Sequence, residues 1–383
     1  MNRFFSNIKG DKVIWMVFIL LAVVSLLAVY SSSGSLAYKY QGGNTEYYLL
    51  KHLWILLFAF VLMYLTHLVK YTYFSRISQL GLYVAIPLLF LTLLSGTSLN
   101  EASRWLTIPV INLTFQTSDL AKLMLIIYLA RLLSRKQETI KDFRAAFIPI
   151  MLPVIITCGL IMPANFSTAA MLFATSLVLM FIGRVNMKYV MALIGMGVVL
   201  VTLLLLISTY VPEILPRKDT WASRLDPDSE GQYQVEQAKI AIATGGIFGK
   251  SPGKSTQRNS LPQAYSDFIF AIIIEEYGLI GGTFLVLLYM ILLYRGIRVG
   301  RYSPGTFGTL VAIGLSFNLV FQALVNMAVA VNILPVTGQP LPFVSMGGTS
   351  IWFSSLAVGI ILSVSRETEK ENAKLSNEQV VAA

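Results

Sequence analysis

Two copies of Gly-Lys-Ser stand close together in the stretch GGIFGKSPGKSTQ, residues 245–257, and this pattern suggests phosphate chemistry. Glycines let a backbone approach a phosphate closely, and Lys250 and Lys254 add flexible positive charges. A Walker A loop needs four residues between its first glycine and Gly-Lys-Ser, but Thr244 and Phe248 occupy the two positions where that glycine would stand. We therefore expect no ATP binding, and we interpret the stretch as a loop that meets a phosphate or pyrophosphate group. A merely flexible basic loop is the alternative.

Three carboxylates lie in the stretch AYSDFIFAIIIEEYGLIGG, residues 264–282. An acid inside an apolar run is costly, so such residues usually face a protein interior or a water-filled cavity. At about 100° per residue of helix, Glu276 lies nearly opposite Asp267, whereas Glu275 is offset by about 80° and lies about 12 Å deeper. We expect Asp267, at the outer mouth of the helix, to act as a base, with helix capping by Ser266 and Asp267 as the alternative. Glu275 and Glu276 are expected to form salt bridges or hydrogen bonds.

Further polar residues stand near the ends of other apolar runs. Lys122 follows a helix start at Ser118-Asp119 by about one turn, so it needs a partner, a wet cavity or an anionic ligand. Arg104 and Trp105 suit a membrane interface, where Arg binds anionic headgroups and Trp anchors the chain. Together with Asp267, these residues predict a polar, cationic cleft that opens on one side of a membrane.

The stretch FQALVNMAVAVNILPVTGQPLPFVSMGGTS, residues 321–350, contains both amides and a rigid turn. Gln322 and Asn326 are four residues apart, so they share a helix face and can bond to other helices. The prolines and glycines that follow predict a re-entrant turn, and backbone that is not helical at this depth must line a cavity or be buried in protein. Structural or cavity-lining roles are therefore expected for Glu275, Glu276, Gln322, Asn326, Pro342, Gly347 and Gly348.

The elements that must position these residues are membrane helices. Of the 383 residues, 56% are hydrophobic and only 13% are charged. A single cysteine, Cys158, excludes an intramolecular disulfide, and two histidines are too few for a His/Cys metal site. The net charge of +10 is interpreted as cytoplasmic loop bias and not as nucleic-acid binding. Apolar runs of spanning length predict ten helices, at residues 13–30, 47–69, 79–96, 118–134, 145–162, 167–183, 187–210, 267–294, 306–330 and 344–365.

The distribution of Lys and Arg in short loops places both termini in the cytoplasm. The predicted architecture is an all-α polytopic membrane protein with a cytoplasmic N-terminus at 1–12, one ten-helix domain at 13–366 and a disordered cytoplasmic tail at 367–383. A long extracytoplasmic loop at 211–266 separates helices seven and eight. Within it, QYQVEQAKIAIA predicts a short helix with Val235, Ala238 and Ile242 on one face, ended by Gly245-Gly246.

Three runs resemble the signature regions of the SEDS family, named for shape, elongation, division and sporulation. They are LTFQTSDLAK, then QVEQAKIAIATGGIFGKSPGKSTQ closing on LPQAYSDFIFAIIIEEYGLIGG, and finally LPVTGQPLPFVSMGGTSI. The similarity spans residues 13–366, with matching helix count and loop placement. Within the family the chain looks more like the cell-division FtsW type than the elongation RodA type.

The resemblance implies a peptidoglycan glycosyltransferase that polymerises lipid II, a disaccharide-pentapeptide on undecaprenyl pyrophosphate. The family's essential aspartate falls on Asp267, the aromatic residue of its first outer loop on Trp105, and its S-E-F-A-K lysine on Lys122. Asp267 would take a proton from the acceptor sugar, and positive charge would stabilise the leaving pyrophosphate. The substrate-binding residues expected on this basis are Arg104, Trp105, Lys122, Arg224, Gln237, Lys250 and Lys254.

The resemblance also implies partners and a place in the cell. A class B penicillin-binding protein transpeptidase, other divisome membrane proteins and membrane lipids are expected partners, at the septum in the bacterial cytoplasmic (inner) membrane. Neither nucleic acid nor ATP is expected to bind. No acidic metal cluster is visible in the sequence, so no metal-binding residue is assigned and a divalent cation is left open.

Three positions depart from the family pattern. Asn165 stands where many members have an acid, Tyr265-Ser266 replaces the His-Thr pair before the aspartate, and Thr337 replaces a lysine of the division type. Two other functions stay open: a flippase that moves lipid II across the bilayer, and a RodA-type elongation polymerase. A scaffold that recruits the transpeptidase is compatible with the enzyme.

Overall fold

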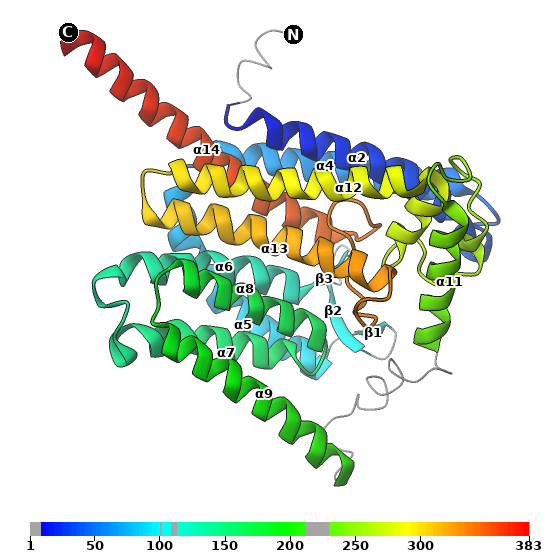
Figure 1. Ribbon diagram of the computed structural model, residues 1–383, viewed down its shortest axis with the longest axis horizontal. Coiled ribbons are helices and arrows are strands. Elements are labelled where there is room, and N and C mark those ends of the chain that lie inside the picture. The colour runs from blue at the N-terminus through cyan, green and yellow to red at the C-terminus, as the bar shows by residue number, and fades with distance from the viewer. Residues whose placement is uncertain (1–8, 96, 100–101, 109–112, 211–229, 383) are drawn as a thin grey trace.

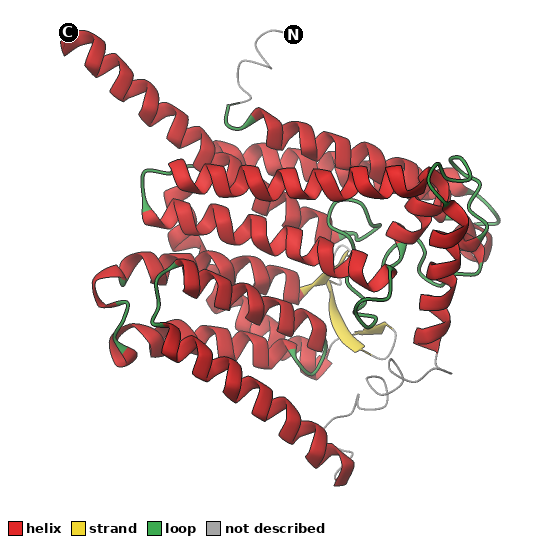
Figure 2. Ribbon diagram, in the orientation of Figure 1, coloured by secondary structure: helices red, strands yellow, loops and turns green. Residues whose placement is uncertain are grey.

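The computed structural model describes residues 9–95, 97–99, 102–108, 113–210 and 230–382. Helices dominate these ranges and lie side by side in one bundle (Figure 1, Figure 2). Ten of them coincide with the predicted apolar runs: α2 (Lys12–Ser32), α4 (Thr45–Leu68), α5 (Tyr71–Ser95), α6 (Thr117–Arg135), α7 (Ile148–Ile161), α8 (Phe166–Ile182), α9 (Met187–Tyr210), α12 (Ile269–Tyr302), α13 (Thr306–Ala330) and α14 (Thr349–Ala382).

Seven helices of the described chain are long and apolar enough to cross a membrane. The chain is therefore an all-α polytopic membrane protein, as predicted. Of the other three helices, α6 carries charges at Asp119, Lys122, Arg131 and Arg135, and α8 has only 17 residues. The number of ten crossings therefore stays a prediction.

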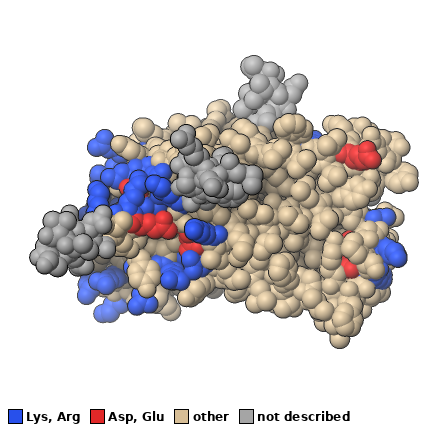
Figure 3. Space-filling model, turned by 90° about the horizontal axis from the view of Figure 1, so that it is seen from above, with Lys and Arg blue, Asp and Glu red and all other residues tan. Residues whose placement is uncertain are grey.

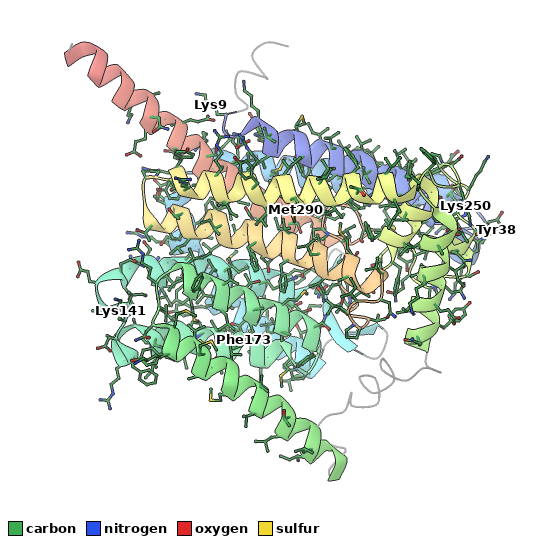
Figure 4. All side chains as sticks on the ribbon, in the orientation of Figure 1. Lys9, Tyr38, Lys141, Phe173, Lys250 and Met290 are labelled. Carbon is green, nitrogen blue, oxygen red and sulfur yellow. The ribbon has the colours of Figure 1, made fainter. Side chains whose placement is uncertain are left out.

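The two ends of the bundle differ in charge. Lys and Arg side chains gather at the end where α2 begins and α14 leaves the bundle (Figure 1, Figure 3). Lys9 and Lys141 lie toward this end, whereas Tyr38 and Lys250 lie at the opposite one (Figure 4). We call the first the basic end and the second the loop end. The distribution is the one expected when the basic end faces the cytoplasm.

A small sheet and a surface helix cover the loop end. Strands β1 (Thr97–Leu99), β2 (Ala102–Ile108) and β3 (Leu113–Gln116) form an antiparallel sheet in the order β1-β2-β3, which the sequence analysis did not predict. Helix α11 (Glu230–Gly245) matches the predicted helix of the long loop and ends at Gly245. It buries Val235, Ala238 and Ala241, while Ile242 packs against the core from a partly buried position.

Helix α12 is broken near its start, which corrects the prediction of one continuous helix from 267 to 294. Gly278 has φ +69° and ψ −172°, so the backbone is not helical there. A Cβ at this position would stand 2.0 Å from the carbonyl oxygen of Ile247. The close crossing of two backbones and the positive φ both require glycine. A short helical segment therefore precedes Gly278, and the long membrane helix follows it.

Helix α14 continues to Ala382, beyond the point where a disordered tail was expected. It leaves the bundle at the basic end (Figure 1). The segment after Arg366 is rich in Glu, Lys and Ala, which favour helices. Glu367 accepts from Lys370 at 2.8 Å, three residues on, and such pairs add a few tenths of a kcal/mol to a helix. The low hydrophobicity of this segment argues against its packing into a core, but it does not argue against a helix.

Candidate functional site

The loop that follows α11 closes around the carboxylate of Glu275, which is fully buried. Lys250 Nζ lies 2.7 Å from Glu275 Oε1, and the Thr256 hydroxyl donates to the same oxygen at 2.8 Å. The Ser255 hydroxyl donates to Oε2. The backbone N–H groups of Thr256 and Gln257 add hydrogen bonds of 3.1 and 3.3 Å. A buried charge is tolerated when it is paired and hydrogen-bonded in this way.

The neighbouring Glu276 is held by the same loop and by α2. Its Oε1 accepts from the Ser255 N–H at 3.3 Å and from the Ser31 hydroxyl. The Glu276 carbonyl accepts from the Ser251 N–H at 3.1 Å. Gly249, with φ +79°, makes this approach feasible, because a Cβ there would stand 2.2 Å from that carbonyl oxygen. The expected salt bridge and hydrogen bonds of the two glutamates are thus present, and most of them involve the loop.

The glutamates lie nearer the loop end than Asp267 does, which reverses the predicted order. Glu276 contacts Ser31, the penultimate residue of α2. Val344, in the turn that binds the backbone of Asp267, instead accepts from the Ser25 hydroxyl. Ser25 lies about 9 Å farther from the loop end along α2 than Ser31 does. The prediction failed because it extended one helix through Gly278, where the chain changes direction.

Lys250 is bound to one of the protein's own carboxylates. Its ammonium group is paired with Glu275 and also donates to the Thr256 hydroxyl at 3.0 Å, and its role in binding pyrophosphate stays a prediction. The glycines of GGIFGKSPGKSTQ bring the loop close to the protein's own glutamates. Lys254, in the second Gly-Lys-Ser, is exposed and remains a candidate for substrate contact.

Asp267 stands on a turn that is fixed at three consecutive backbone carbonyls. The carbonyl oxygens of residues 265–267 accept, in order, from the Met346 N–H at 2.9 Å, the Ser345 hydroxyl at 2.5 Å and the Asn326 amide at 2.8 Å. The donors come from α13 and from the turn before α14, so elements far apart in sequence hold the aspartate in place. Fixed backbone of this kind orients a side chain for chemistry.

The side chain of Asp267 is partly exposed and accepts a hydrogen bond from the Ser266 hydroxyl at 3.0 Å. The N-cap of α12 is Phe268, whose side chain forms no capping bond, and helix capping by Ser266 and Asp267 stays a prediction. Burial, reinforced by the Asp267 carboxylate, raises the pKa of the Tyr265 hydroxyl above its ordinary value. Tyr265 therefore stays protonated near neutral pH and can donate a hydrogen bond.

Lys122 contacts one polar residue on α6 and one on α13. Its Nζ lies 2.8 Å from Asp119 Oδ1 and donates to Gln322 Oε1 at 3.3 Å, and Gln322 Nε2 donates in turn to the Pro340 carbonyl at 2.9 Å. A cavity of about 30 Å³ adjoins these side chains, which is room for water. It is also lined by Leu123, Leu315, Asn318, Leu319, Ser350, Phe353, Ser354 and Ala357. Lys122 is thus paired beside a cavity with room for water, in keeping with the partner or cavity that its position in the sequence predicts.

An apolar groove of about 400 Å³ opens between α8, α13 and the segment after α13. It adjoins the polar site on two sides. Asn326, next to the groove residue Val325, binds the Asp267 carbonyl, and Thr168, next to the groove residue Ser167, accepts from Gln339 Nε2 at 2.6 Å. The groove is lined by Phe166, Ser167, Ala170, Met171, Phe321, Val325, Leu334, Pro335, Val336 and Thr337.

The remaining predicted substrate residues are placed by backbone position. Arg104 and Trp105 lie on β2, where Trp105 pairs with Gln116 at the start of α6. Gln237 is half-buried on α11. Arg224 lies outside the described residues. The roles of these four residues in substrate binding stay predictions.

The turn of residues 339–346 is the part of the site that sequence reasoning underestimated. Pro342 is buried and its carbonyl accepts from the Tyr289 hydroxyl, while Gly347 and Gly348 lead into α14, with φ +53° at Gly348. Gln339 was not predicted, although its carbonyl accepts from Asn326 Nδ2 at 2.8 Å. Polar residues between the prolines were the available signal. In the described part of the chain, no group of three or more His, Cys, Asp and Glu residues converges on a metal site.

The geometry agrees with what comparisons with known proteins find. The family model described as "Cell cycle protein", which covers FtsW, RodA and SpoVE, matches residues 11–370. Stage V sporulation protein E of Bacillus subtilis is 32% identical over 93% of this chain and 97% of its own length. A probable peptidoglycan glycosyltransferase FtsW of a Geobacter species is 32% identical over 93% of this chain and 96% of its own.

The fold is also found among solved structures. One chain of a peptidoglycan synthase complex, described as coordinating polymerization and crosslinking, superposes with a TM-score of 0.73. The alignment covers 94% of this chain and 98% of that chain at 24% identity. The similarity shows that the whole bundle, and not one part of it, has a known arrangement.

Proposed function

The chain belongs to the FtsW/RodA/SpoVE family of cell-cycle proteins, and we propose that it is a peptidoglycan glycosyltransferase that polymerises lipid II. The observation that carries the proposal is the position of Asp267. Its carboxylate is partly exposed on a turn whose carbonyls are held by Asn326, Ser345 and Met346. Asn326 lies one turn of α13 from Gln322, which bonds to Lys122, and it follows Val325 of the apolar groove. A fixed, partly exposed carboxylate whose backbone support lies near a cation's partner and an apolar groove suits glycosyl transfer from a lipid carrier.

In the proposed reaction, the 4-hydroxyl of an acceptor lipid II attacks the anomeric carbon of the growing chain. A new glycosidic C–O bond forms as the bond to the lipid pyrophosphate breaks, with inversion at that carbon. Asp267 accepts the proton of the attacking hydroxyl. General-base assistance of this kind is worth about a hundred- to ten-thousandfold in rate.

The leaving pyrophosphate needs positive charge nearby, because charge develops on its oxygen in the transition state. We assign this role first to Lys122, which is held by Asp119 and Gln322 beside a cavity with room for water. Lys254, exposed at the loop end, is the second cation. Arg104, Trp105, Gln237 and Arg224 are further substrate contacts that the family resemblance supports.

The apolar groove between α8 and α13 suits part of the lipid tail. Its volume is about 400 Å³, its lining is mostly apolar, and it adjoins the residues that bind Asp267 and Gln339. A polyprenyl chain lying there would place its pyrophosphate beside the polar turn. Each buried CH₂ group would contribute roughly 0.8 kcal/mol to binding.

Partners and location follow from the same family. Relatives named FtsW and the solved synthase complex support an FtsW-like enzyme that works with a transpeptidase, which crosslinks the strands as this chain extends them. A class B penicillin-binding protein, other divisome proteins and the septum of the bacterial inner membrane complete the proposal.

Labelled lipid II, supplied to the purified protein and its transpeptidase partner in detergent without nucleotide, tests the proposal. Wild-type protein is expected to make glycan chains, and Asp267→Asn to make at least a hundredfold fewer, because the base is lost. The matched control is Asp142→Asn, an exposed carboxylate at the basic end that caps a helix turn, and it should leave the rate unchanged.

Two results would count against the assignment. Normal polymerisation by Asp267→Asn would exclude this residue as the base. Absence of glycan chains with wild-type protein, combined with transfer of lipid II across liposome membranes by the same preparation, would favour a flippase. Glu275, Glu276 and Lys122 would then line a transport route.

A further inference from the structure

A buried hydrogen-bonded chain links α2 and α4 to the turn before α14. The Ser25 hydroxyl donates to the Val344 carbonyl at 2.8 Å, and His52 Nε2 lies 2.6 Å from the same hydroxyl oxygen. Ser25 and His52 are both fully buried, as is Val344. Polar side chains at this depth are costly unless they bond, so these contacts determine how the three elements pack.

The direction of each hydrogen bond follows from the single proton on Ser25. Because that proton goes to the Val344 carbonyl, the Ser25 oxygen accepts from His52, and His52 must carry its proton on Nε2. Ser25 therefore does not give its proton to the histidine, as a nucleophilic serine would. The pair is suited to holding a carbonyl and not to attacking a substrate.

The residue after Val344 connects this pair to the candidate base. The Ser345 hydroxyl donates to the carbonyl of Ser266 at 2.5 Å and accepts from the Leu341 N–H at 2.7 Å. The next residue, Met346, donates its N–H to the carbonyl of Tyr265 at 2.9 Å. The path from Ser25 to the backbone around Asp267 thus runs through two adjacent peptide units.

We propose that Ser25 and His52 are positioning residues for Asp267, acting through the turn of residues 339–346. They do not touch the substrate. They hold the Val344 carbonyl and thereby orient the two residues that follow it. The Ser345 hydroxyl and the Met346 N–H then fix the backbone on which Asp267 stands. The inference rests on the proposed function, because a displaced Asp267 matters to the rate only if it is the base.

A small displacement is sufficient to affect the reaction, since a misplacement of about 1 Å can cost a large factor in rate. Without Ser25 the Val344 carbonyl would be buried and unpaired, and the turn would gain alternative positions. Substrate binding through Lys122 and the apolar groove would be less affected, because most of those contacts come from α6, α8 and α13. The effect should therefore fall on kcat and not on KM.

Ser25→Ala, assayed with lipid II and the transpeptidase partner, tests the inference together with hydrogen exchange followed by mass spectrometry. We expect kcat to fall about fivefold, the loss expected for one hydrogen bond, with KM changed by less than about twofold. Amides of residues 339–346 should exchange faster. Those of residues 250–257, which bind Glu275, should not change.

Matched variants separate positioning from stability. Ser32→Ala removes a buried hydroxyl of the same helix that bonds only within it, to the Ala28 carbonyl, and should leave kcat and exchange unchanged. His52→Gln retains an amide N–H that can reach the Ser25 oxygen, so it should keep more activity than His52→Leu.

The inference is overturned if Ser25→Ala leaves both kcat and exchange at residues 339–346 unchanged. It is also overturned if exchange rises equally at 250–257, because the residue would then only stabilise the fold. An active Asp267→Asn variant would instead contradict the proposed base. In that case exchange at residues 265–268 would still show whether Ser25 holds this turn.

Discussion

Glu275 retains a charge in the interior because donors meet both of its carboxylate oxygens. Lys250 supplies the compensating charge, and hydroxyl and backbone groups of the same loop complete the shell. Removing one partner of a buried ion pair costs about 3–5 kcal/mol in general, since the other charge is left uncompensated. Lys250 is 28% exposed at its side chain, so water can replace part of its contribution.

Lys250→Met keeps the length of the side chain and removes its charge. We expect a loss of about 1–3 kcal/mol in the free energy of unfolding, which thermal unfolding in detergent would show as a lower Tm. Lys254→Met, in the second Gly-Lys-Ser of the loop, should change stability by less than about 0.5 kcal/mol. The double variant with Glu275→Gln should cost less than the sum of the single changes, and simple additivity would argue against direct coupling.

Individual site residues were predictable where a charge interrupts an apolar run. Asp267, Lys122 and the two glutamates were identified because unpaired charges are expensive in such runs. Their partners were not identifiable in the same way. Lys250 reaches Glu275 only because the chain turns back at Gly278, and no spacing rule connects His52 with Ser25. These pairings depend on tertiary structure.

At the scale of elements, the break in α12 sets the arrangement of the site. Before Gly278, a short helical segment carries Glu275 and Glu276 to the loop end, and after it the chain returns as a long membrane helix. The crossing is tight, because a Cβ at Gly278 would meet backbone atoms of Ile247 and Gly249. The Leu279 N–H donates to the Gly246 carbonyl at 2.9 Å, which joins α12 to the loop.

Gly278→Ala should therefore destabilise the protein more than an ordinary helix substitution. The positive φ costs about 1–3 kcal/mol for a residue with a side chain, and the Cβ would clash with a backbone carbonyl that cannot move aside. Size-exclusion chromatography and thermal unfolding would show less folded protein and a lower Tm. Gly197→Ala on α9, where a Cβ meets nothing within 4 Å, should be neutral or stabilising. Equal effects of both changes would contradict the argument.

Helices were predictable from the sequence to the extent that apolar length defines them. The ten runs correspond to ten helices because spanning length and hydrophobicity act along a continuous segment. The three strands were missed because they have only three to seven residues and are defined by pairing with one another. The helical end of α14 was missed because its polar composition was interpreted as disorder. The break at Gly278 cannot be recognised from hydropathy, since the apolar run resumes directly after this residue.

At the scale of the whole molecule, the asymmetry of charge gives the bundle a direction. Lys and Arg side chains gather at the basic end (Figure 3), and the elements that carry the polar turn, the glutamates and the apolar groove meet in the opposite half (Figure 1). Positively charged loops are retained in the cytoplasm during membrane insertion. The site should consequently face the outer side, where a lipid-linked sugar can be joined to a growing strand.

Labelling of introduced cysteines tests this direction. With Cys158, the single cysteine of the chain, replaced by alanine, Lys254→Cys places a thiol at the loop end and Lys141→Cys places one at the basic end, both at exposed positions. A maleimide that cannot cross membranes should label only Lys254→Cys in spheroplasts, and both variants after permeabilisation. The reverse pattern would place Asp267 on the cytoplasmic half of the bilayer. Polymerisation at the outer face would then be impossible through this site, even if purified protein extended glycan chains in detergent.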